Sequence, residues 1–399
     1  MRDQIAKKVV VVGGGGHVGL PLALVLADSG FQAVSLDISK DVVESINSGK
    51  MPFAEEGAQA LLTRTLGNNS FYATTDHKEI ASAEIVIVVI GTPVDEHLNP
   101  DPNSVVHAMS ACIPYMNSKQ LVILRSTVFP GVTERVKNLL AQSNLTPDVT
   151  FCPERILEGH ALKELHELPQ IIGANDQRAA DRASAVFETL GVKTIRVTPE
   201  EAELGKLFTN VWRYIKFAAA NQFWLMSNEA GLDFSKIREA VIFDYPRASD
   251  LPNAGFAAGP CLFKDTMQLA AFSNNTFGLG HSAMMVNEGL PLYVVKKIEE
   301  KYDLKDLKVG ILGAAFKGES DDIRSSLSYK LKKILEFKSK RVIMTDPYVT
   351  VDANLVSLDQ TLAESDVLII GAPHKIYKDL ATTKPVVDIW NLFGNGNLI

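Results

Sequence analysis

The sequence predicts an α/β fold in which two α/β domains are joined by a helical middle region. Over the first half, short apolar or β-branched runs alternate with helix-like stretches, a rhythm typical of a parallel sheet with crossover helices. Residues 198–232 then form one long helical pattern, and a second αβ alternation begins at residue 307. Because 399 residues are too many for one ordinary core, we expect three domains, at residues 1–198, 199–300 and 301–399.

Each expected element has its own signal in the sequence. The long helix has Thr198 as a candidate N-cap, Pro199 at a favourable first position and Gly231 at a favourable end. The opening of the last domain resembles that of the first but lacks its third glycine. We expect the strands of the first domain at residues 8–12, 33–36, 85–90, 121–124 and 171–172, and those of the last within LKVGILG, RVIMTD, DVLIIGAP and PVVDIW.

The composition is that of a globular protein with no electrostatic footprint for nucleic acid. The chain is 46% hydrophobic and 22% charged, has a net charge of -7 and contains no Lys/Arg runs, which argues against nucleic acid or a membrane surface as a partner. No apolar run approaches the ~18 residues of a membrane span and no signal-peptide pattern is present, so we expect a cytoplasmic protein. Cys112, Cys152 and Cys261 lack CxxC spacing, and His17 and His281 have no partner at a ligand spacing. We therefore expect neither disulfides nor a metal.

A glycine-rich turn connects the first expected strand to the first helix. In VVVVGGGGHVGLPLA the strand leads into Gly14-x-Gly16-x-x-Gly19, a spacing that lets the backbone approach a pyrophosphate at a helix N-terminus. The next strand ends at Asp37, whose carboxylate can bind ribose hydroxyls and would repel a 2′-phosphate. This context favours a Rossmann-type domain that binds NAD rather than NADP over a glycine turn without a ligand. The candidate cofactor contacts are Gly14, Gly16, His17, Val18, Gly19 and Asp37.

Another strand end, in IVIVVIGTPV, is also expected near the cofactor. Gly91, Thr92 and Pro93 follow this strand, at the edge where open α/β sheets bind ligands. For Thr92 alone, the capping of a turn is an equally good explanation.

The stretch GPCLFKD places a cysteine directly after a Gly-Pro corner. If Cys261 begins a helix, Asp265 lies on the same face at i,i+4, and the helix N-terminus favours a thiolate. A thiolate beside an NAD site can capture an aldehyde as a thiohemiacetal, which a second NAD oxidises to a thioester, so one enzyme could take an alcohol to an acid. The alternative is an inert buried thiol, which is the usual state of a free cysteine and the one we expect for Cys112 and Cys152.

This chemistry also needs a group that stabilises an oxyanion and a base. Lys206 and Asn210 are i,i+4 on the long helix, so an ammonium and an amide can point at one oxyanion, unless the two simply form a solvated helix face. Glu154 and Glu158 follow an apolar strand and are expected to share one side of a helical turn. The alternative for Glu154 is a surface ion pair with Arg155.

Seven motifs follow one another along nearly the whole chain: GHVGLPLA, GTPVDEHLNPDP, RSTVFPG, CPERILEG, EAELGKLFTN, GPCLFKD and FKGESDDIRSS. In this set and order they resemble the nucleotide-sugar 6-dehydrogenases, a family that includes UDP-glucose and UDP-N-acetylmannosamine dehydrogenases. The resemblance implies an NAD-dependent, four-electron oxidation of the C6 alcohol of a UDP-sugar to a uronic acid, for use in polysaccharide biosynthesis. It also implies an N-terminal NAD domain, a central dimerisation region around the long helix and a C-terminal Rossmann-like domain that binds the UDP-sugar.

The resemblance implies a role for each motif residue. Cys261 would be the nucleophile, and Glu154 would help water to cleave the thioester. Lys206 and Asn210 would hold the oxyanion, Thr127 and Asp265 would hold the catalytic water, and Thr127, Glu158 and Arg324 would approach the cofactor. Arg247 would reach into the site of a neighbouring subunit, which implies a homodimer. The implied substrate contacts are Glu154, Ile156, Leu157, Glu158, Lys206, Asn210, Arg247, Gly255, Lys264, Phe316 and Lys317.

The identity of the sugar depends on smaller features. The CPER motif and the short spacing from Pro246-Arg247 to the cysteine resemble the N-acetylhexosamine branch, which favours UDP-N-acetylmannosamine. The stretch GFAAGPC departs from the usual glycine pair, so Ala257, Ala258 and Pro260 are expected to reshape the floor under the sugar. UDP-glucose is the alternative substrate.

Two other function classes share parts of this pattern. A two-electron dehydrogenase of the hydroxyacid type also has a Rossmann domain followed by a long helix, and it would produce one NADH per substrate with no role for Cys261. An NAD-bound regulatory or scaffolding protein would keep the fold without turnover. The complete set of candidate catalytic residues favours the four-electron enzyme.

Overall fold

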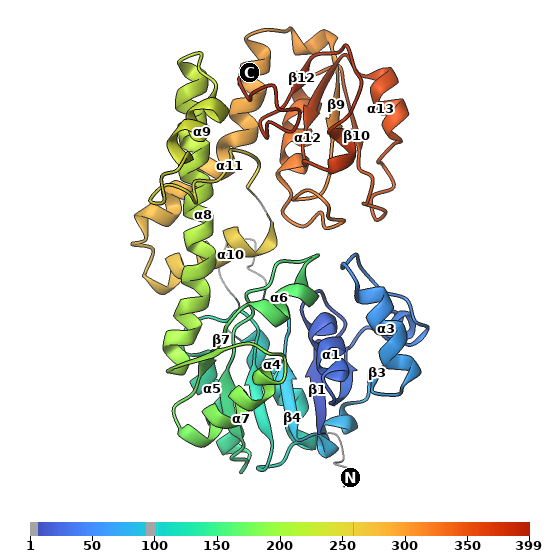
Figure 1. The fold of residues 1–399 in the computed structure, drawn as a ribbon, viewed down its shortest axis with the longest axis vertical. Helices are drawn as coiled ribbons and strands as arrows, with labels where there is room; N and C mark the ends of the chain where they lie inside the picture. The colour runs from blue at the N-terminus through green and yellow to red at the C-terminus, as the bar shows by residue number, and fades with distance from the viewer. Residues whose placement is uncertain (1–6, 93–100, 102, 258) are drawn as a thin grey trace. The chain divides into compact units, whose positions relative to one another are not determined.

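The computed structural model describes residues 7–92, 101, 103–257 and 259–399 (Figure 1). The chain divides into two compact units, Met1–Thr209 and Asn210–Ile399. Each unit is an α/β structure with its own parallel strands, as the alternating pattern predicts. The predicted domain borders at 198/199 and 300/301 stay predictions.

The first unit is built around a sheet that, within the described residues, has eight strands in the order β3-β2-β1-β4-β5-β6-β7-β8. The order of its first six strands, β3-β2-β1-β4-β5-β6, is that of a dinucleotide-binding domain. The strands are β1 (Lys8–Val12), β2 (Gln32–Leu36), β3 (Phe71–Thr74), β4 (Ile85–Val88), β5 (Leu121–Leu124), β6 (Asp148–Phe151), β7 (Gln170–Gly173) and β8 (Thr194–Val197).

The sheet differs from the predicted one in two respects. One pairing is antiparallel, between β6 and β7 at Phe151 and Gly173, whereas the prediction was a parallel sheet. Strand β6 was expected only as the apolar strand before Glu154. Strands β3 and β8 were not predicted, because both lie at the edges of the sheet and neither is buried along its whole length. A half-exposed edge strand does not produce the continuous apolar run that marks a central parallel strand.

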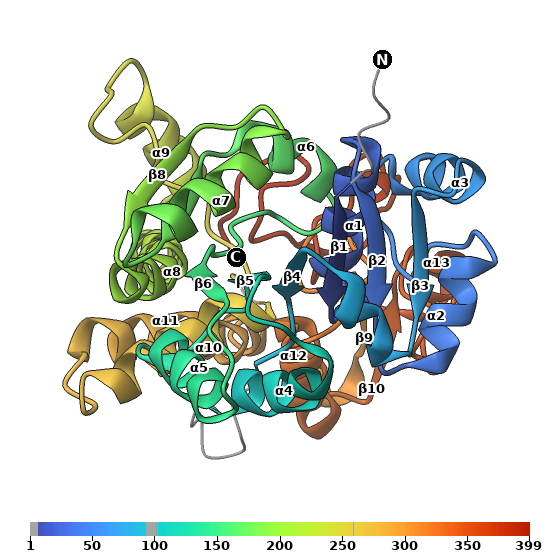
Figure 2. The same cartoon turned by 90° about the horizontal axis from the view of Figure 1, so that it is seen from below.

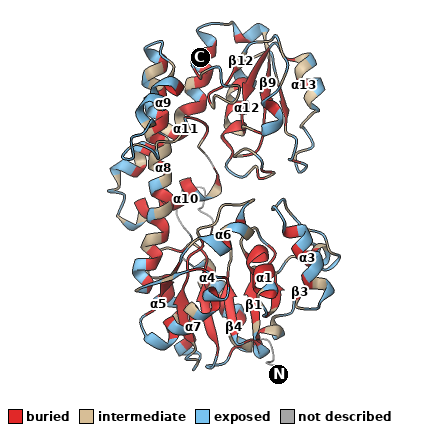
Figure 3. Ribbon diagram, viewed as in Figure 1, coloured by how far each residue is buried: buried red, intermediate tan, exposed pale blue. Residues whose placement is uncertain are grey.

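Helices cover both faces of this sheet (Figure 2). Val9 and Val11 of β1 pack into one apolar cluster with α1 and α7, and Val10 and Val12 pack into a second cluster with α4 and α5. Burial on both faces explains the uninterrupted VVVV run and the red strands of Figure 3. The helices are α1 (Gly19–Asp28), α2 (Lys40–Asn47), α3 (Ala58–Gly67), α4 (Ser104–Cys112), α5 (Val132–Gln142), α6 (Ala161–Glu167) and α7 (Gln177–Glu188).

The long helix α8 (Pro199–Glu229) confirms the prediction for residues 198–232. Its start is a capping box: the Thr198 hydroxyl accepts the Glu201 N–H at 3.2 Å, and the Glu201 carboxylate accepts the Thr198 N–H at 2.8 Å. Beyond its end, Gly231 adopts a left-handed φ of 69°, a conformation that glycine adopts without strain. The border between the two units falls inside this helix.

The second unit combines helices with a smaller parallel sheet of order β10-β9-β11-β12 in the described part of the chain. Its strands are β9 (Lys308–Leu312), β10 (Arg341–Thr345), β11 (Val367–Ile370) and β12 (Val386–Val387). Its helices after α8 are α9 (Phe234–Ile242), α10 (Pro260–Phe272), α11 (Gly278–Glu299), α12 (Leu327–Lys338) and α13 (Leu358–Glu364). The second αβ alternation predicted from residue 307 is thereby confirmed.

None of the helices that the structure describes is long and apolar enough to cross a lipid bilayer.

Candidate active site

The glycine turn after β1 has the geometry of a nucleotide cradle. Gly13 has a left-handed φ of 78°, and a Cβ there would lie 2.0 Å from the Val89 carbonyl oxygen. A Cβ at Gly19 would lie 2.4 Å from the Gly13 oxygen, so the turn and the first helix pack too closely for any side chain. Gly16 differs, since a Cβ there would meet no atom of the described residues closer than 3.9 Å. The second glycine of the motif thus leaves its backbone open to an approaching pyrophosphate, which fits NAD.

Asp37 follows β2 and organises this turn. Its carboxylate accepts the Gly15 N–H at 2.9 Å and the Ser39 N–H at 3.0 Å. The carboxylate therefore lies at the carboxyl edge of the sheet, beside the glycine turn. Its predicted ribose contact stays a prediction.

Exchange of Asp37 tests this contact. We expect Asp37→Ala to weaken NAD binding by about tenfold to a hundredfold, the scale of a lost charge-assisted hydrogen bond, and Asp37→Arg to admit NADP. The measurement is kcat/KM with each cofactor. Asp41 is an exposed acidic residue in α2. Asp41→Ala is therefore the matched control and should leave the preference for NAD over NADP unchanged. An unchanged preference in Asp37→Arg would reject the assigned role.

Two neighbouring strand ends are tied together beside the turn. The buried Thr92, after β4, donates its hydroxyl hydrogen to the Thr127 carbonyl oxygen at 2.6 Å, after β5. This bond joins two strand ends that are far apart in the sequence, so it is not the turn cap that we considered as the alternative, and it fixes Thr127 at the carboxyl edge. The predicted cofactor contact of Thr92 stays a prediction. Pro93 lies outside the described residues.

Glu154 lies just after β6 in a buried ion pair that the sequence did not indicate. Arg125 donates from Nη2 to Glu154 Oε2 at 2.7 Å, and both side chains are more than nine-tenths buried. Arg125 is itself held by the Cys152 carbonyl at 3.1 Å and by Gln170 Oε1 at 2.7 Å. A cavity beside the pair measures only about 10 Å³, which is roughly the room for one water. Arg125 thus orients the carboxylate of Glu154. The cavity beside the pair is too small to hold a substrate.

The expected helical turn carrying Glu154 and Glu158 is wrong. Residues 152–157 have no regular structure, and α6 begins only at Ala161. The Glu154 side chain accepts the Ile156 N–H, a local side-chain bond to the backbone two residues on. The alternative ion pair with Arg155 is also wrong, because Arg155 donates to the Pro169 carbonyl and Glu154 pairs with Arg125.

Lys206 and Asn210 are not a solvated helix face. Their residues are only 7% and 5% exposed, so α8 presents an ammonium and an amide to the protein interior. One turn earlier, Glu203 accepts the Gly131 N–H at 2.6 Å and the Thr133 N–H at 2.8 Å, which anchors this end of α8 to the start of α5. Lys206 belongs to the first unit, and Asn210 belongs to the second.

Cys261 takes the second position of α10, after Gly259 as N-cap and Pro260 at the first position. Gly259 has a left-handed φ of 110°, and a Cβ there would lie 2.7 Å from the Phe316 ring. The thiol therefore lies at a helix N-terminus next to the loop that carries Phe316, in the surroundings that favour a thiolate. Of the three cysteines, all within the described residues, Cys261 alone is exposed.

The other two cysteines have the inert surroundings that we expected. Burial raises the pKa of Cys112 to about 11. Burial likewise raises the pKa of Cys152 to about 12. Neither thiol forms a thiolate near neutral pH.

Asp265 lies one turn after Cys261 and joins two predicted site residues. It is fully buried, accepts from Asn210 Nδ2 at 2.6 Å and lies 3.0 Å from Lys264 Nζ through its other oxygen. The bond to Asp265 fixes the orientation of the Asn210 side chain. Because an amide nitrogen carries two hydrogens, the second N–H of Asn210 can donate to another acceptor. The second unit thus brings Asn210, Lys264 and Asp265 together beside the thiol.

The remaining predicted residues of the second unit lie in loops and turns. A Cβ at Gly255 would lie 2.2 Å from the Trp390 ring, so the chain passes too close for a side chain. Lys317 lies 5.6 Å from the centroid of the Phe316 ring, and Arg324 is ion-paired with Asp322 at 2.6 Å. Arg247, after α9, is exposed and donates from Nε to the Tyr245 hydroxyl at 2.8 Å.

Comparison with known proteins covers most of the chain. Residues 7–191 match the NAD binding domain of the UDP-glucose/GDP-mannose dehydrogenase family, residues 200–288 match its central domain and residues 310–395 match its UDP binding domain. The UDP-N-acetyl-D-mannosamine dehydrogenase of Pyrococcus horikoshii is 30% identical over 93% of this chain and 90% of the relative.

Solved structures agree with the sequence comparison. The structure of the Pyrococcus horikoshii enzyme has a TM-score of 0.90 at 27% identity and covers 96% of each chain. A UDP-glucose dehydrogenase from Pyrobaculum islandicum has a TM-score of 0.90 at 28% identity, over 97% of this chain and 95% of that one. The predicted fold class, the NAD cofactor and the prediction of an enzyme are confirmed. The chain belongs to the UDP-glucose/GDP-mannose dehydrogenase family of NAD-dependent oxidoreductases.

Proposed function

We propose that this protein oxidises the C6 alcohol of a UDP-N-acetylhexosamine, UDP-N-acetylmannosamine foremost, to the uronic acid through a thioester on Cys261. The observation that carries the proposal is the exposed thiol at the start of α10, with the bonded pair Asn210–Asp265 one turn away. The nucleotide sugar is supported by the match to a UDP binding domain. The N-acetylated sugar is supported by relatives named for that substrate.

The covalent step depends on Cys261. NAD, when bound, accepts a hydride from the substrate carbon in each of two oxidations. The first oxidation produces an aldehyde, and the Cys261 thiolate adds to its carbon to form a thiohemiacetal. Lys206 and the second N–H of Asn210 stabilise the oxygen anion that develops. Loss of the second hydride converts this adduct to a thioester on Sγ.

Water then releases the product. Glu154 takes a proton from the attacking water, and the thioester carbon–sulfur bond breaks to give the uronic acid and the free thiolate. Arg125 keeps the Glu154 carboxylate oriented at 2.7 Å. Thr127 and Asp265 hold the water, Glu158 and Arg324 approach the cofactor, and Phe316 with Lys317 contacts the UDP-sugar.

A panel of nucleotide sugars tests this proposal. We expect turnover with UDP-N-acetylmannosamine, with two NADH formed per sugar. The absorbance of NADH measures this ratio. Turnover with UDP-glucose alone would instead support the alternative function, oxidation of UDP-glucose. The similarity to the UDP-glucose dehydrogenase of Pyrobaculum islandicum favours that alternative. One NADH per sugar would indicate a two-electron dehydrogenase and contradict the thioester.

We also propose a homodimer with Arg247 acting across the interface. Large apolar side chains are exposed on the second unit, at Trp212, Phe223 and Met226 along one face of α8 and at Met285 of α11. A partner subunit would cover such a face.

Mixing two variants tests the shared site. Arg247→Ala and Cys261→Ala should each be nearly inactive as pure dimers. A randomly mixed dimer population should regain about a quarter of wild-type activity, because half of the dimers contain one site with both residues intact. No recovery in subunits shown to exchange would place Arg247 in its own site.

A further inference from the structure

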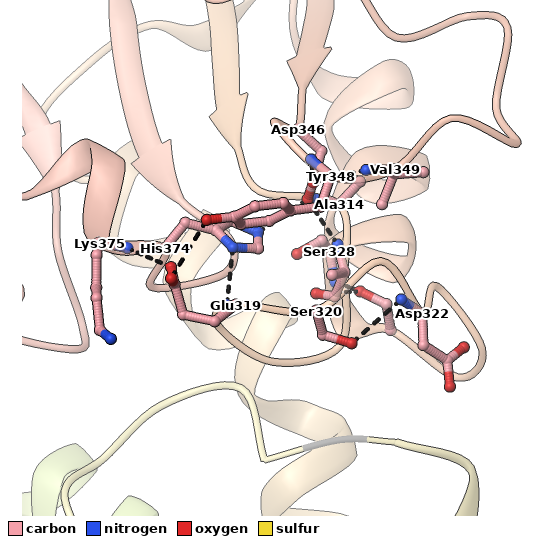
Figure 4. A network of polar contacts seen from close by, with 12 residues as sticks. Ala314, Glu319, Ser320, Asp322, Ser328, Asp346, Tyr348, Val349, His374 and Lys375 are labelled. Carbon is pink, nitrogen blue, oxygen red and sulfur yellow. Dashed lines mark hydrogen bonds and ion pairs between the residues drawn. The ribbon is translucent and has the colours of Figure 1, made fainter. Parts of the chain in front are cut away.

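The loop after β9, residues 313–326, carries the proposed substrate contacts Phe316 and Lys317. Loops that follow the neighbouring strands β10 and β11 hold this loop in place (Figure 4). Gly318 packs against the β11 loop so closely that a Cβ there would lie 2.5 Å from the Pro373 carbonyl oxygen. The conformation of the loop is therefore set by its neighbours.

His374 is the central side chain of this contact. It is fully buried, and its Nδ1 lies 3.0 Å from the Glu319 backbone nitrogen, whose N–H it accepts. Its Nε2 lies 3.0 Å from Asp346 Oδ2. Because Nδ1 accepts, the proton lies on Nε2, which donates to the carboxylate. His374 thus connects the backbone of the β9 loop to an anchor on the β10 loop.

Asp346 is that anchor. Besides His374, Oδ2 accepts the Ala314 N–H at 2.7 Å and the Ala315 N–H at 3.0 Å, while Oδ1 accepts the Tyr348 N–H at 2.8 Å. Burial alone would raise the pKa of Asp346, but the hydrogen bonds from His374 and the backbone outweigh it and lower that pKa. The carboxylate therefore stays ionised. It occupies, after β10, the position that Asp37 occupies after β2, and like Asp37 it accepts backbone N–H groups from the loop after the neighbouring strand.

Glu319 receives this support in a conformation that few residues adopt unaided. Its φ is 54°, in the left-handed region, which a residue other than glycine keeps only where its surroundings hold it there. Its carboxylate accepts the Lys375 N–H at 2.7 Å and the Tyr348 hydroxyl at 3.2 Å. Backbone and side chain are both bonded to the two neighbouring loops, so the β9 loop is held at this residue.

The position of Phe316 follows from this arrangement. Its N–H donates to the Asp322 carbonyl at 2.9 Å across the same loop, and its ring packs on Gly259, two residues before Cys261. Phe316, a proposed substrate contact, therefore lies close to the nucleophile, and a displacement of the loop would move Phe316 out of this position.

We propose that His374 is a positioning residue for UDP-sugar binding, acting through the Glu319 N–H to hold the β9 loop. The proposal rests on the function proposed above, since it requires that Phe316 and Lys317 contact the UDP-sugar. The bond to Glu319 is the part that matters for binding, and the bond to Asp346 orients the ring.

Two substitutions separate these bonds. The Asn side chain places an acceptor where Nδ1 lies, so His374→Asn retains the bond to Glu319 and loses that to Asp346. His374→Gln places a donor near the Nε2 position and loses the bond to Glu319. We expect His374→Gln to raise the Kd for UDP and the KM for the UDP-sugar about tenfold, which is the scale of losing one hydrogen bond that holds the loop. Both values for His374→Asn should stay within about threefold of wild type. The KM for NAD should not change in either variant.

Further variants keep the test decisive. Thr361→Val removes a buried hydroxyl of α13 that bonds the Ser357 carbonyl at 3.0 Å, and it should lower the melting temperature without changing UDP binding. Tyr348→Phe, at a partly exposed position, removes one contact of Glu319 and should weaken UDP binding about twofold to threefold even if His374→Gln fails to fold.

The outcomes distinguish the two proposals. Equal losses in the Asn and Gln variants, or a rise in the KM for NAD alongside, would reduce His374 to a purely structural residue and overturn the inference. Wild-type UDP binding in a folded His374→Gln would also overturn it. A wild-type protein that binds no UDP and oxidises no UDP-sugar would refute the proposed function itself.

Discussion

Cys261→Ser is expected to lower acid formation by roughly 10⁴-fold or more, the scale of removing a covalent nucleophile. A serine hydroxyl without an adjacent base is a much weaker nucleophile than a thiolate at a helix N-terminus, so neither the thiohemiacetal nor the thioester forms. NAD binding should remain close to wild type, because the glycine turn and Asp37 belong to the first unit and Cys261 belongs to the second. Steady-state NADH formation and an NAD titration measure the two effects.

Cys112→Ala provides the matched control for this substitution. It removes a buried thiol of α4 whose pKa burial raises to about 11, so it changes no reactive group. We expect it to retain activity with a modest loss of stability. Undiminished acid formation by Cys261→Ser would end the thioester proposal.

Glu154→Gln is expected to separate the oxidations from the hydrolysis. The amide cannot take the proton of the attacking water, so steady-state turnover should fall by about 10²–10⁴-fold. A rapid burst of two NADH per site should remain, because both hydride transfers precede hydrolysis. Stopped-flow absorbance shows the burst and the slow phase in one trace. A variant without any burst would place Glu154 in an earlier step, and an unchanged steady-state rate would remove it from the mechanism.

The stability of this variant needs its own measurement. Loss of a buried charge partner typically costs about 3–5 kcal/mol, but glutamine still offers Arg125 an oxygen, so the loss should be smaller. Thermal unfolding will show whether the variant is folded at the assay temperature. Gln170→Leu removes another acceptor of Arg125 and is the control for disturbing the arginine without touching Glu154.

The sequence predicts most of the framework because local signals determine it. The close-packed Gly14 and Gly19, the Thr198 cap and the start of α10 before Cys261 each depend on a few neighbouring residues. Such features follow from backbone geometry that only certain residue types allow. Lys206 and Asn210 could be paired by helical spacing alone, although their burial could not be predicted.

The features that sequence analysis missed depend on contacts between distant parts of the chain. Arg125 and Glu154 are 29 residues apart and meet because β5 and β6 are neighbours in the sheet. The only sequence signal was that RST and CPE both follow apolar strands, whose carboxyl ends meet at one edge. The bond between Glu319 and His374 spans 55 residues and had no such signal. The expected helical turn at Glu154 is not formed: residues 152–157 have no regular structure, and the carboxylate of Glu154 is held by Arg125 from a neighbouring strand end.

The proposed mechanism requires a covalent bond between the half-oxidised sugar and the sulfur atom of Cys261. Glu154→Gln, incubated with NAD and the UDP-sugar, acid-quenched and digested, should yield a peptide containing Cys261 that is heavier by the acyl group. The double variant with Cys261→Ser should yield no such peptide. If the wild-type protein forms acid while no adduct is found on Cys261, or while the added mass lies on another residue, the thioester mechanism is wrong.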